Sequence, residues 1–169
     1  MLKPSDYFYE TYEGVKRQCA SWAGKPITKL PTTFKARQYL MLNVNITKAF
    51  VAVQPLSVAV NAPKCFKFYK SGILSKTDCD CSATIYEDVE VNELMTIVGY
   101  GNVDKTAPES NTCDGYWMVR ASYGTSWGEK GYARLCIPKD QTTDSIGTCN
   151  IQVYPMFPDV GLTMPIFTQ

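Results

Sequence analysis

The sequence predicts an α+β fold in which antiparallel β-structure dominates and the helices are short. The second half of the chain contains four runs rich in β-branched and aromatic residues, separated by clusters of Gly, Pro, Asp and Ser: Met95–Gly101, Tyr116–Ser122, Gly131–Ile137 and Ile151–Met156. The 169 residues, 45% of them hydrophobic, suffice for one domain with a sizeable core. We therefore expect a single domain built on a twisted sheet or a small barrel.

The amino-terminal part of the chain has no regular pattern. Residues 1–34 contain three prolines and two glycines among aromatic residues, which indicates irregular chain. The segment Lys35–Leu42 has the composition of a strand. Asn43 or Asn45 is the expected cap of a short helix that runs to Val53.

Pro55 ends this helix because proline cannot donate a backbone hydrogen bond. The next run, Leu56–Val60, alternates as a strand, and a short helix is expected at Lys64–Tyr69 before Gly72. The candidate core of the sheet comes from apolar side chains of three strands: Met95, Ile97, Tyr116, Met118, Leu135 and Ile137.

The composition argues against several classes of function. With 17 Lys and Arg against 16 Asp and Glu, the net charge is +1, which gives no electrostatic reason to expect a nucleic acid as a partner. The longest apolar stretch, residues 49–60, is interrupted and too short to span a bilayer. The chain has no histidine, which excludes a histidine general base and His-ligated zinc unless another chain supplies the ring. We also expect no metal and no cofactor.

Two neighbouring stretches carry a recognisable pattern. Residues 96–101 read TIVGYG, and residues 116–134 read YWMVRASYGTSWGEKGYAR. This order closely resembles the papain-like (cathepsin-like) cysteine protease family, in which a strand ending in VGYG precedes a strand that leads into NSWGxxWGExGYxR. Further segments resemble the family in the same order, namely residues 6–19, 54–60, 68–73 and Cys149 followed by Tyr154-Pro155.

The resemblance implies a fold and a domain organisation. The papain-like fold packs a largely helical lobe against a β-barrel lobe, and this chain resembles the carboxy-terminal part. Residues 1–169 then form a single, partial peptidase domain, with residues 1–34 as a loop-rich remnant of the first lobe and residues 35–169 as the β-rich lobe. The family's QGxCGSCW segment, which carries the nucleophilic cysteine, has no match in this sequence, so we expect the amino-terminal helical part to be lacking.

The positions that match the family's catalytic residues are altered. Residues 91–101 read VNELMTIVGYG where the family reads LNHAVxxVGYG, so Glu93 stands at the position of the base histidine. Ala121 stands at the asparagine that orients this histidine, and Tyr123 at the tryptophan that covers the pair. A carboxylate is negative at neutral pH and raises the pKa of a neighbouring thiol, whereas the family's mechanism needs an imidazolium that lowers it.

The resemblance therefore implies a pseudoenzyme with no catalytic residue, serving as a structural or interaction component of a larger assembly. Two alternatives stay open: the carboxy-terminal chain of a two-chain cysteine peptidase whose nucleophile lies on another chain, and a peptide-binding module that uses the inactive cleft. Asn92 and Leu94 would line that cleft. Because the missing lobe would leave an apolar face uncovered, we expect another polypeptide, or an upstream segment of the same gene product, to cover it.

The seven cysteines are an odd number, so at least one is unpaired within the chain. By the resemblance, Cys79 or Cys81 pairs with Cys149 in an oxidising environment. Cys19 matches a cysteine whose family partner lies in the unmatched segment, so it is either a free thiol or an interchain link. The other three have no family counterpart: Cys65, Cys113 and Cys136. Cys136 is expected to be a buried small hydrophobe.

Two short patterns bear on the compartment. Asn45 begins the common acceptor pattern for N-linked glycosylation and Asn111 its rarer variant, which mildly favours a secreted protein. The family's ancestry is lysosomal or secreted. The sequence begins without an apolar run of the signal-peptide type, so a cytoplasmic assembly also stays open.

Overall fold

A mostly antiparallel sheet with one α-helix forms the described part of this computed structural model, namely residues 35–38, 43–79, 81, 91–140 and 146–159. Residues 1–34, including Cys19, and residues 39–42 of the predicted first strand lie outside the described residues. The elements follow in the order β1 (Lys35–Gln38), α1 (Val44–Val53), β2 (Leu56–Val60), η2 (Lys64–Phe68), β3 (Ile73–Leu74), β4 (Glu93–Asn102), η3 (Pro108–Asn111), β5 (Cys113–Arg120), β6 (Tyr132–Pro138), η4 (Thr148–Asn150) and β7 (Met156–Asp159).

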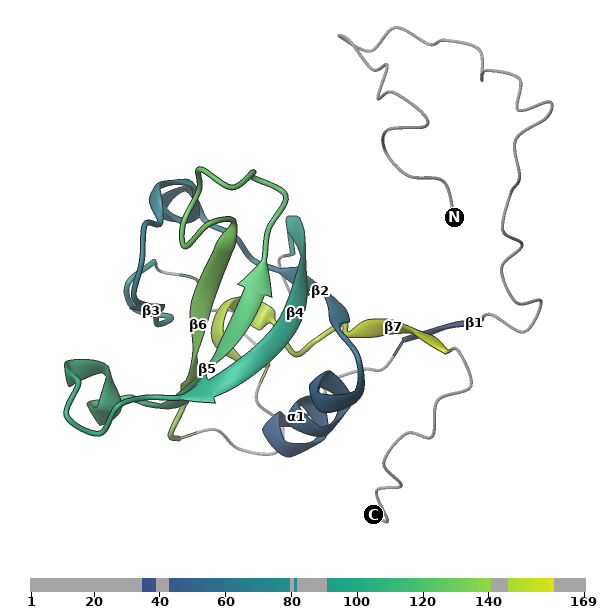
Figure 1. The fold of residues 1–169 in the computed structure, drawn as a ribbon, viewed down its shortest axis with the longest axis horizontal. Helices are drawn as coiled ribbons and strands as arrows, with labels where there is room; N and C mark the ends of the chain where they lie inside the picture. The colour runs from purple at the N-terminus through teal and green to yellow at the C-terminus, as the bar shows by residue number, and fades with distance from the viewer. Residues whose placement is uncertain (1–34, 39–42, 80, 82–90, 141–145, 160–169) are drawn as a thin grey trace, which may run out of the picture. The chain divides into compact units, whose positions relative to one another are not determined.

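The strands pair in the order β1-β7-β2-β4-β5-β6-β3, and only β3 and β6 run parallel. Figure 1 shows β4, β5 and β6 side by side as a twisted sheet, with α1 near one end of β4. The predicted α+β class, with antiparallel strands and short helices, is confirmed. None of the described helices is long and apolar enough to cross a membrane.

The first turn of α1 shows why the helix begins where it does. Of the two candidate caps, Asn43 is the one used: its Oδ1 accepts the backbone N–H of Ile46 at 2.9 Å. The hydroxyl of Thr47 donates to the carbonyl oxygen of Asn43, also at 2.9 Å. The helix ends at Val53, as the sequence predicts, and its buried face carries Phe50 against the sheet.

The predicted core of β5 is wrong by one position. Trp117 and Val119 are fully buried, whereas Tyr116 and Met118 are only partly buried. Side chains alternate between the two faces of a strand, and this strand has large apolar residues at both parities, so the sequence pattern could not choose the face. The four core residues predicted on the neighbouring strands are buried: Met95, Ile97, Leu135 and Ile137.

The strand predicted at Ile151–Met156 is also wrong, because β7 begins only at Met156. The preceding residues form the 3-10 turn η4 and a following turn. Cys149 and Asn150 have φ values of 54° and 64°, in the left-handed region that an extended strand does not use. The apolar residues after them are buried all the same, so hydrophobicity here reported burial rather than strand structure.

Candidate functional site

Glu93 and Tyr123 form the polar centre of the candidate site. Glu93 is the first residue of β4 and pairs with Val60, the last residue of β2, so its side chain emerges at one end of two adjacent strands. Tyr123 lies in the loop between β5 and β6, and its hydroxyl donates to Glu93 Oε2 at 2.9 Å. The structure therefore brings two of the three altered positions into direct contact.

The environment of Tyr123 keeps its phenol protonated. Burial, together with the hydrogen bond to Glu93 and the charge of that carboxylate, raises the pKa of Tyr123 to about 12. The ring packs edge-on against Trp127, with the ring centroids 5.0 Å apart. At neutral pH the phenol is thus held as a hydrogen-bond donor to the carboxylate.

Ala121 presents a methyl group two residues before Tyr123 in the same loop. It is 9% exposed, and its backbone N–H donates to the carbonyl oxygen of Gly131 at 3.2 Å. A methyl group can neither donate nor accept a hydrogen bond, so this side chain cannot orient a catalytic base. Its contribution in the described structure is apolar packing at the edge of the core.

A hollow of about 390 Å³ lies beside Glu93 and is lined by Ala59, Val91, Asn92, Glu93 and Leu94. Both polar atoms of the Asn92 side chain are hydrogen-bonded: Oδ1 accepts the N–H of Ala62 at 2.8 Å, and Nδ2 donates to the carbonyl oxygen of Ala62 at 3.3 Å. These two hydrogen bonds join the chain after β2 to the start of β4. Leu94 is 62% exposed and forms an apolar wall of the hollow.

Trp127 anchors the loop that carries the altered positions. Its indole Nε1 donates to the backbone carbonyl oxygen of Phe66 at 2.9 Å, and its ring stacks on that of Phe66 with centroids 5.8 Å apart. Tyr69 packs on the same indole at 5.5 Å. The indole of Trp127 is thus buried with its N–H hydrogen-bonded, and these contacts hold the loop against η2.

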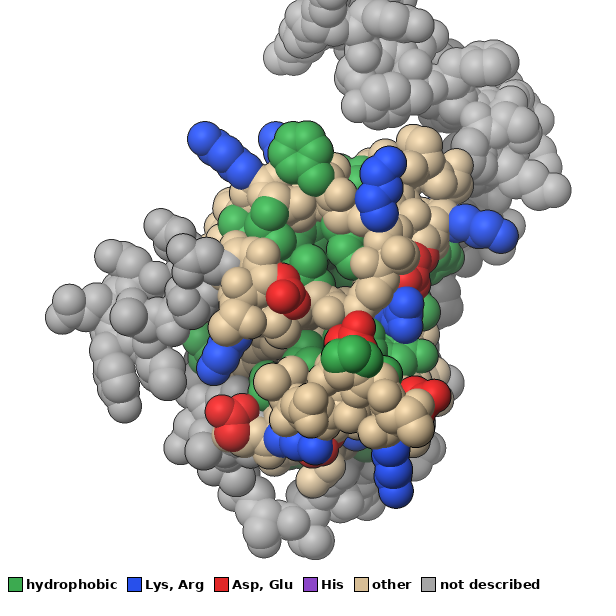
Figure 2. Space-filling model, turned by 90° about the vertical axis from the view of Figure 1, so that its left-hand side faces the viewer, with side chains coloured by type: hydrophobic (Ala, Val, Ile, Leu, Met, Phe, Trp, Pro, Cys, Tyr) green, Lys and Arg blue, Asp and Glu red, His purple; other side chains and the backbone are tan. Residues whose placement is uncertain are grey.

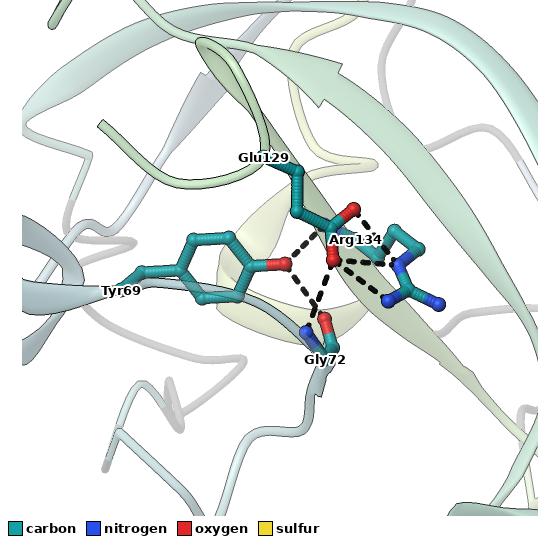
Figure 3. A network of polar contacts seen from close by, with 4 residues as sticks. All are labelled: Tyr69, Gly72, Glu129 and Arg134. Carbon is teal, nitrogen blue, oxygen red and sulfur yellow. Dashed lines mark hydrogen bonds and ion pairs between the residues drawn. The ribbon is translucent and has the colours of Figure 1, made fainter. Parts of the chain in front are cut away.

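A second polar network joins Glu129, in the loop between β5 and β6, to Arg134 and to Gly72 (Figure 3). The guanidinium of Arg134, on β6, contacts both carboxylate oxygens of Glu129, the shortest contact being 2.7 Å. Glu129 also accepts the backbone N–H of Gly72 at 3.1 Å, and the hydroxyl of Tyr69 donates to the carbonyl oxygen of Gly72 at 2.7 Å. Burial opposes ionisation of Glu129, but the contacts with Arg134 and Gly72 outweigh it and hold the pKa of Glu129 below its ordinary value.

Three disulfides stabilise the described part of the chain. Cys81 is bonded to Cys149, one of the two pairings expected for Cys149. Cys79, the other candidate, is bonded instead to Cys65. Cys113 and Cys136 form the third bridge, so the expectation that Cys136 is only a small hydrophobe is wrong, although it is buried as expected.

Several features of the site escape sequence reasoning. The hydrogen bond between Glu93 and Tyr123 joins residues 30 positions apart, and only the chemical complementarity of a carboxylate and a phenol at matched family positions hints at it. The Cys113–Cys136 bridge crosses two adjacent strands whose register the sequence does not specify. Among the described residues, no group of three or more acidic, Cys or His side chains is placed to hold a metal ion.

Comparison with known proteins agrees with this geometry. The profile described as "Papain family cysteine protease" matches residues 2–158. Cathepsin M of Mus musculus is 32% identical over 155 residues, which cover 91% of this chain and 40% of that protein. Fruit bromelain of Ananas comosus is 32% identical over 108 residues, which cover 64% of this chain and 25% of that protein.

A solved structure described as a recombinant stem bromelain precursor superposes with a TM-score of 0.61 and 28% sequence identity, over 87% of this chain and 41% of that one. The chain belongs to the papain family of cysteine proteases and has the papain-like fold. It spans between a quarter and two fifths of the length of the two curated relatives named above.

Proposed function

We propose that this chain is a non-catalytic member of the papain family that serves as a structural or interaction component of a larger assembly. The observation that carries the proposal is the hydrogen bond from Tyr123 to Glu93 at the place where the family holds an imidazole. A carboxylate at this position raises the pKa of a neighbouring thiol and so disfavours the thiolate that must attack the peptide bond. The carboxylate's nearest hydrogen-bond partner is a phenol whose pKa is itself raised to about 12.

The other chemical requirements of the family's mechanism also lack support in this chain. Ala121 offers no polar group to hold a base in position. All six cysteines in the described part of the chain are in disulfides, so none of these six is a free thiol. Meanwhile the residues that hold the loop in place, Trp127 and the Glu129–Arg134 pair, keep their contacts. Retained packing with altered chemistry is what a structural role requires.

An apolar surface along β4 supports the interaction role. Leu94 is 62% and Tyr100 45% exposed, and Val98 lies between them with 37% exposure. The face drawn in Figure 2, which is the side of β3 in Figure 1, carries acidic and basic side chains mixed with hydrophobic ones, with no block of a single charge. Exposed apolar side chains on one strand favour a protein partner, while the mixed charge gives no support for a nucleic acid. The partner is therefore proposed to be another polypeptide or an upstream segment that covers β4.

One observation favours the second candidate, a peptide-binding module. The hollow beside Glu93 has apolar walls and one carboxylate, which suits a peptide segment bound without cleavage. This candidate differs from the first in the size of its ligand. It predicts binding of short peptides, whereas a structural component buries on the order of 1,000 Å² or more against a folded partner.

The experiment starts from the protein purified from its natural source. A thiol-reactive peptide probe is applied to the purified complex, and the labelling is compared with that of a complex formed by the recombinant variant Glu93→Ala. We expect no co-purifying chain whose labelling depends on Glu93. Labelling of a co-purifying chain that is abolished by Glu93→Ala would instead support the two-chain peptidase and overturn the proposal.

A pair of matched variants tests the partner. Leu94→Asp places a charge in the apolar surface of β4 and should abolish co-purification of the partner. Phe68→Asp is the control, since Phe68 is even more exposed, at 79%, but belongs to η2 rather than β4. Equal retention of the partner by both variants would remove β4 from the interface. Circular dichroism of both variants checks that the fold is intact.

A further inference from the structure

Two asparagines begin acceptor patterns for N-linked glycosylation, and the structure distinguishes them. Asn45 leads the common form, with threonine as the third residue, and Asn111 leads the rarer form, with cysteine as the third residue. Both asparagines are exposed. Exposure alone therefore does not decide which asparagine can be glycosylated. The third residue of each pattern decides it.

The surroundings of Asn45 accommodate a modification. It is the second residue of α1, and no hydrogen bond of its side chain is found among the described residues. The third residue of its pattern, Thr47, is 1% exposed and its hydroxyl donates to the carbonyl oxygen of Asn43. A group attached to Asn45 therefore projects into solvent without disturbing the cap of the helix, which Asn43 supplies.

The surroundings of Asn111 oppose the same modification. The third residue of its pattern is Cys113, which is buried and bonded to Cys136. The rarer acceptor pattern requires this cysteine as a thiol, and the disulfide consumes the thiol. Formation of the third bridge thus removes the pattern at Asn111 while leaving that at Asn45 intact.

The disulfides also indicate the compartment in which the chain folds. Three bridges close loops with sequence separations of 14, 68 and 23, and bridges of this kind persist in oxidising compartments such as the secretory pathway. N-linked glycosylation takes place in that pathway. We propose that Asn45 carries an N-linked oligosaccharide and that Asn111 does not.

The transfer needs one co-reactant, an oligosaccharide joined to a lipid through a diphosphate. The side-chain amide nitrogen of Asn45 forms a bond to the first carbon of the terminal sugar. The bond between that carbon and the diphosphate oxygen breaks, and the lipid diphosphate leaves with the electron pair. The amide nitrogen releases one proton, so the product is a neutral N-glycosidic amide.

The position of Asn45 limits where a partner can bind. Lys48 lies one helical turn further on, and its ammonium group is 5.6 Å from the ring centroid of Tyr100. An oligosaccharide on Asn45 therefore lies near the Tyr100 end of β4. Leu94 is six residues away along the strand, or about 20 Å, and stays accessible. This restriction of the interface rests on the proposed function, whereas the glycan itself does not.

Peptide mapping of the natural protein tests the glycan. Trypsin cleaves after Arg37 and Lys48 and so releases residues 38–48, which contain Asn45 and the unmodified internal control Asn43. A peptide-N-glycosidase in heavy-oxygen water converts a glycosylated asparagine to labelled aspartate. We expect the label on Asn45, none on Asn43 and none on Asn111.

Expression of the full chain through the secretory pathway of cultured cells supplies the matched variants. Asn45→Gln should abolish the glycosidase-sensitive shift in mass. Thr47→Ser should retain the shift because serine preserves the acceptor pattern, and Asn111→Gln should retain it because Asn111 is not modified. An unlabelled Asn45 in the natural protein, a label on Asn111, or natural protein whose Cys113 is a free thiol would each overturn the proposal.

Discussion

The Cys81–Cys149 bridge closes the longest loop of the three described disulfides and should contribute most to stability. Its sequence separation is 68, for which the chain-entropy relation gives a loss of about 4 kcal/mol in the free energy of unfolding when both cysteines are replaced by alanine. The Cys113–Cys136 bridge has a separation of 23 and lies within that loop, which it shortens to about 46 residues, so the same relation gives about 0.6 kcal/mol less for its removal.

The comparison between the two double variants removes most other contributions. All four cysteines are almost fully buried, so each double variant loses a similar amount of sulfur packing. Cys149 has a φ of 54°, but alanine meets the same steric restriction there as cysteine, so the backbone strain is unchanged. The difference therefore reports the closed loop.

Equilibrium unfolding in urea, followed by tryptophan fluorescence, measures this difference. With a slope of roughly 2 kcal/mol per molar urea, the midpoint of the variant lacking Cys81–Cys149 should lie about 0.3 M below that of the variant lacking Cys113–Cys136. The variant lacking the Cys65–Cys79 bridge, whose separation is 14, should be destabilised least. An equal or larger loss for the Cys113–Cys136 variant would refute the chain-entropy reasoning for this protein.

Three further perturbations act on the loop that carries the altered positions. The pKa of Tyr123 is raised to about 12, so between pH 10 and 12 the folded protein keeps a proton that the unfolded chain releases, and the free energy of unfolding falls as the pH rises through this range. Tyr123→Phe cannot donate a hydrogen bond to Glu93 and should remove this part of the alkaline fall, as measured by urea unfolding at a series of pH values. Arg134→Met should lower the free energy of unfolding by about 1 kcal/mol at neutral pH. In the wild type the lowered pKa of Glu129 stabilises the folded protein, and this contribution is lost as the pH falls through that pKa; the variant should lack this acid-dependent loss. Gly128→Ala should lower the thermal midpoint, because a Cβ there would lie 2.5 Å from a backbone carbonyl oxygen at a φ of +55°, a strain on the order of 1–3 kcal/mol.

Each of these expectations has a contrary result. An unchanged alkaline profile in Tyr123→Phe would mean that another group causes the fall. Arg134→Lys retains the charge but not the paired contacts, so it should be intermediate, and a Lys variant as stable as the wild type would show that paired contacts with Glu129 add nothing. A Gly128→Ala variant with an unchanged midpoint would show that the loop relaxes around the added methyl group.

Local sequence patterns predicted a large part of the fold. Local patterns predict the end of α1 at Val53 and the strand Leu56–Val60, and they narrow the helix cap to Asn43 or Asn45, because caps, proline and alternation act over a few residues. The buried face of β5 was predicted wrongly, because both faces of that strand carry apolar side chains and only pairing with neighbours selects one.

The altered positions themselves follow from the order of residues. The absence of histidine and the identities of Glu93, Ala121 and Tyr123 are properties of the sequence, and chemical reasoning from them needs no coordinates. The contact between Glu93 and Tyr123 and the choice of Cys81 over Cys79 as the partner of Cys149 are different in kind. These depend on distances across the sheet and its loops, which short-range patterns do not encode.

The amino-acid sequence by itself therefore determined the family, the class of fold and the absence of an imidazole, since composition and ordered motifs can be recognised without knowing which distant segments are in contact. Only the tertiary structure decided which cysteines meet, which face of β5 is buried and what holds the carboxylate of Glu93. The physical reason is that burial and pairing depend on segments far apart in the chain, whose mutual placement is selected by packing of the whole domain rather than by any local preference.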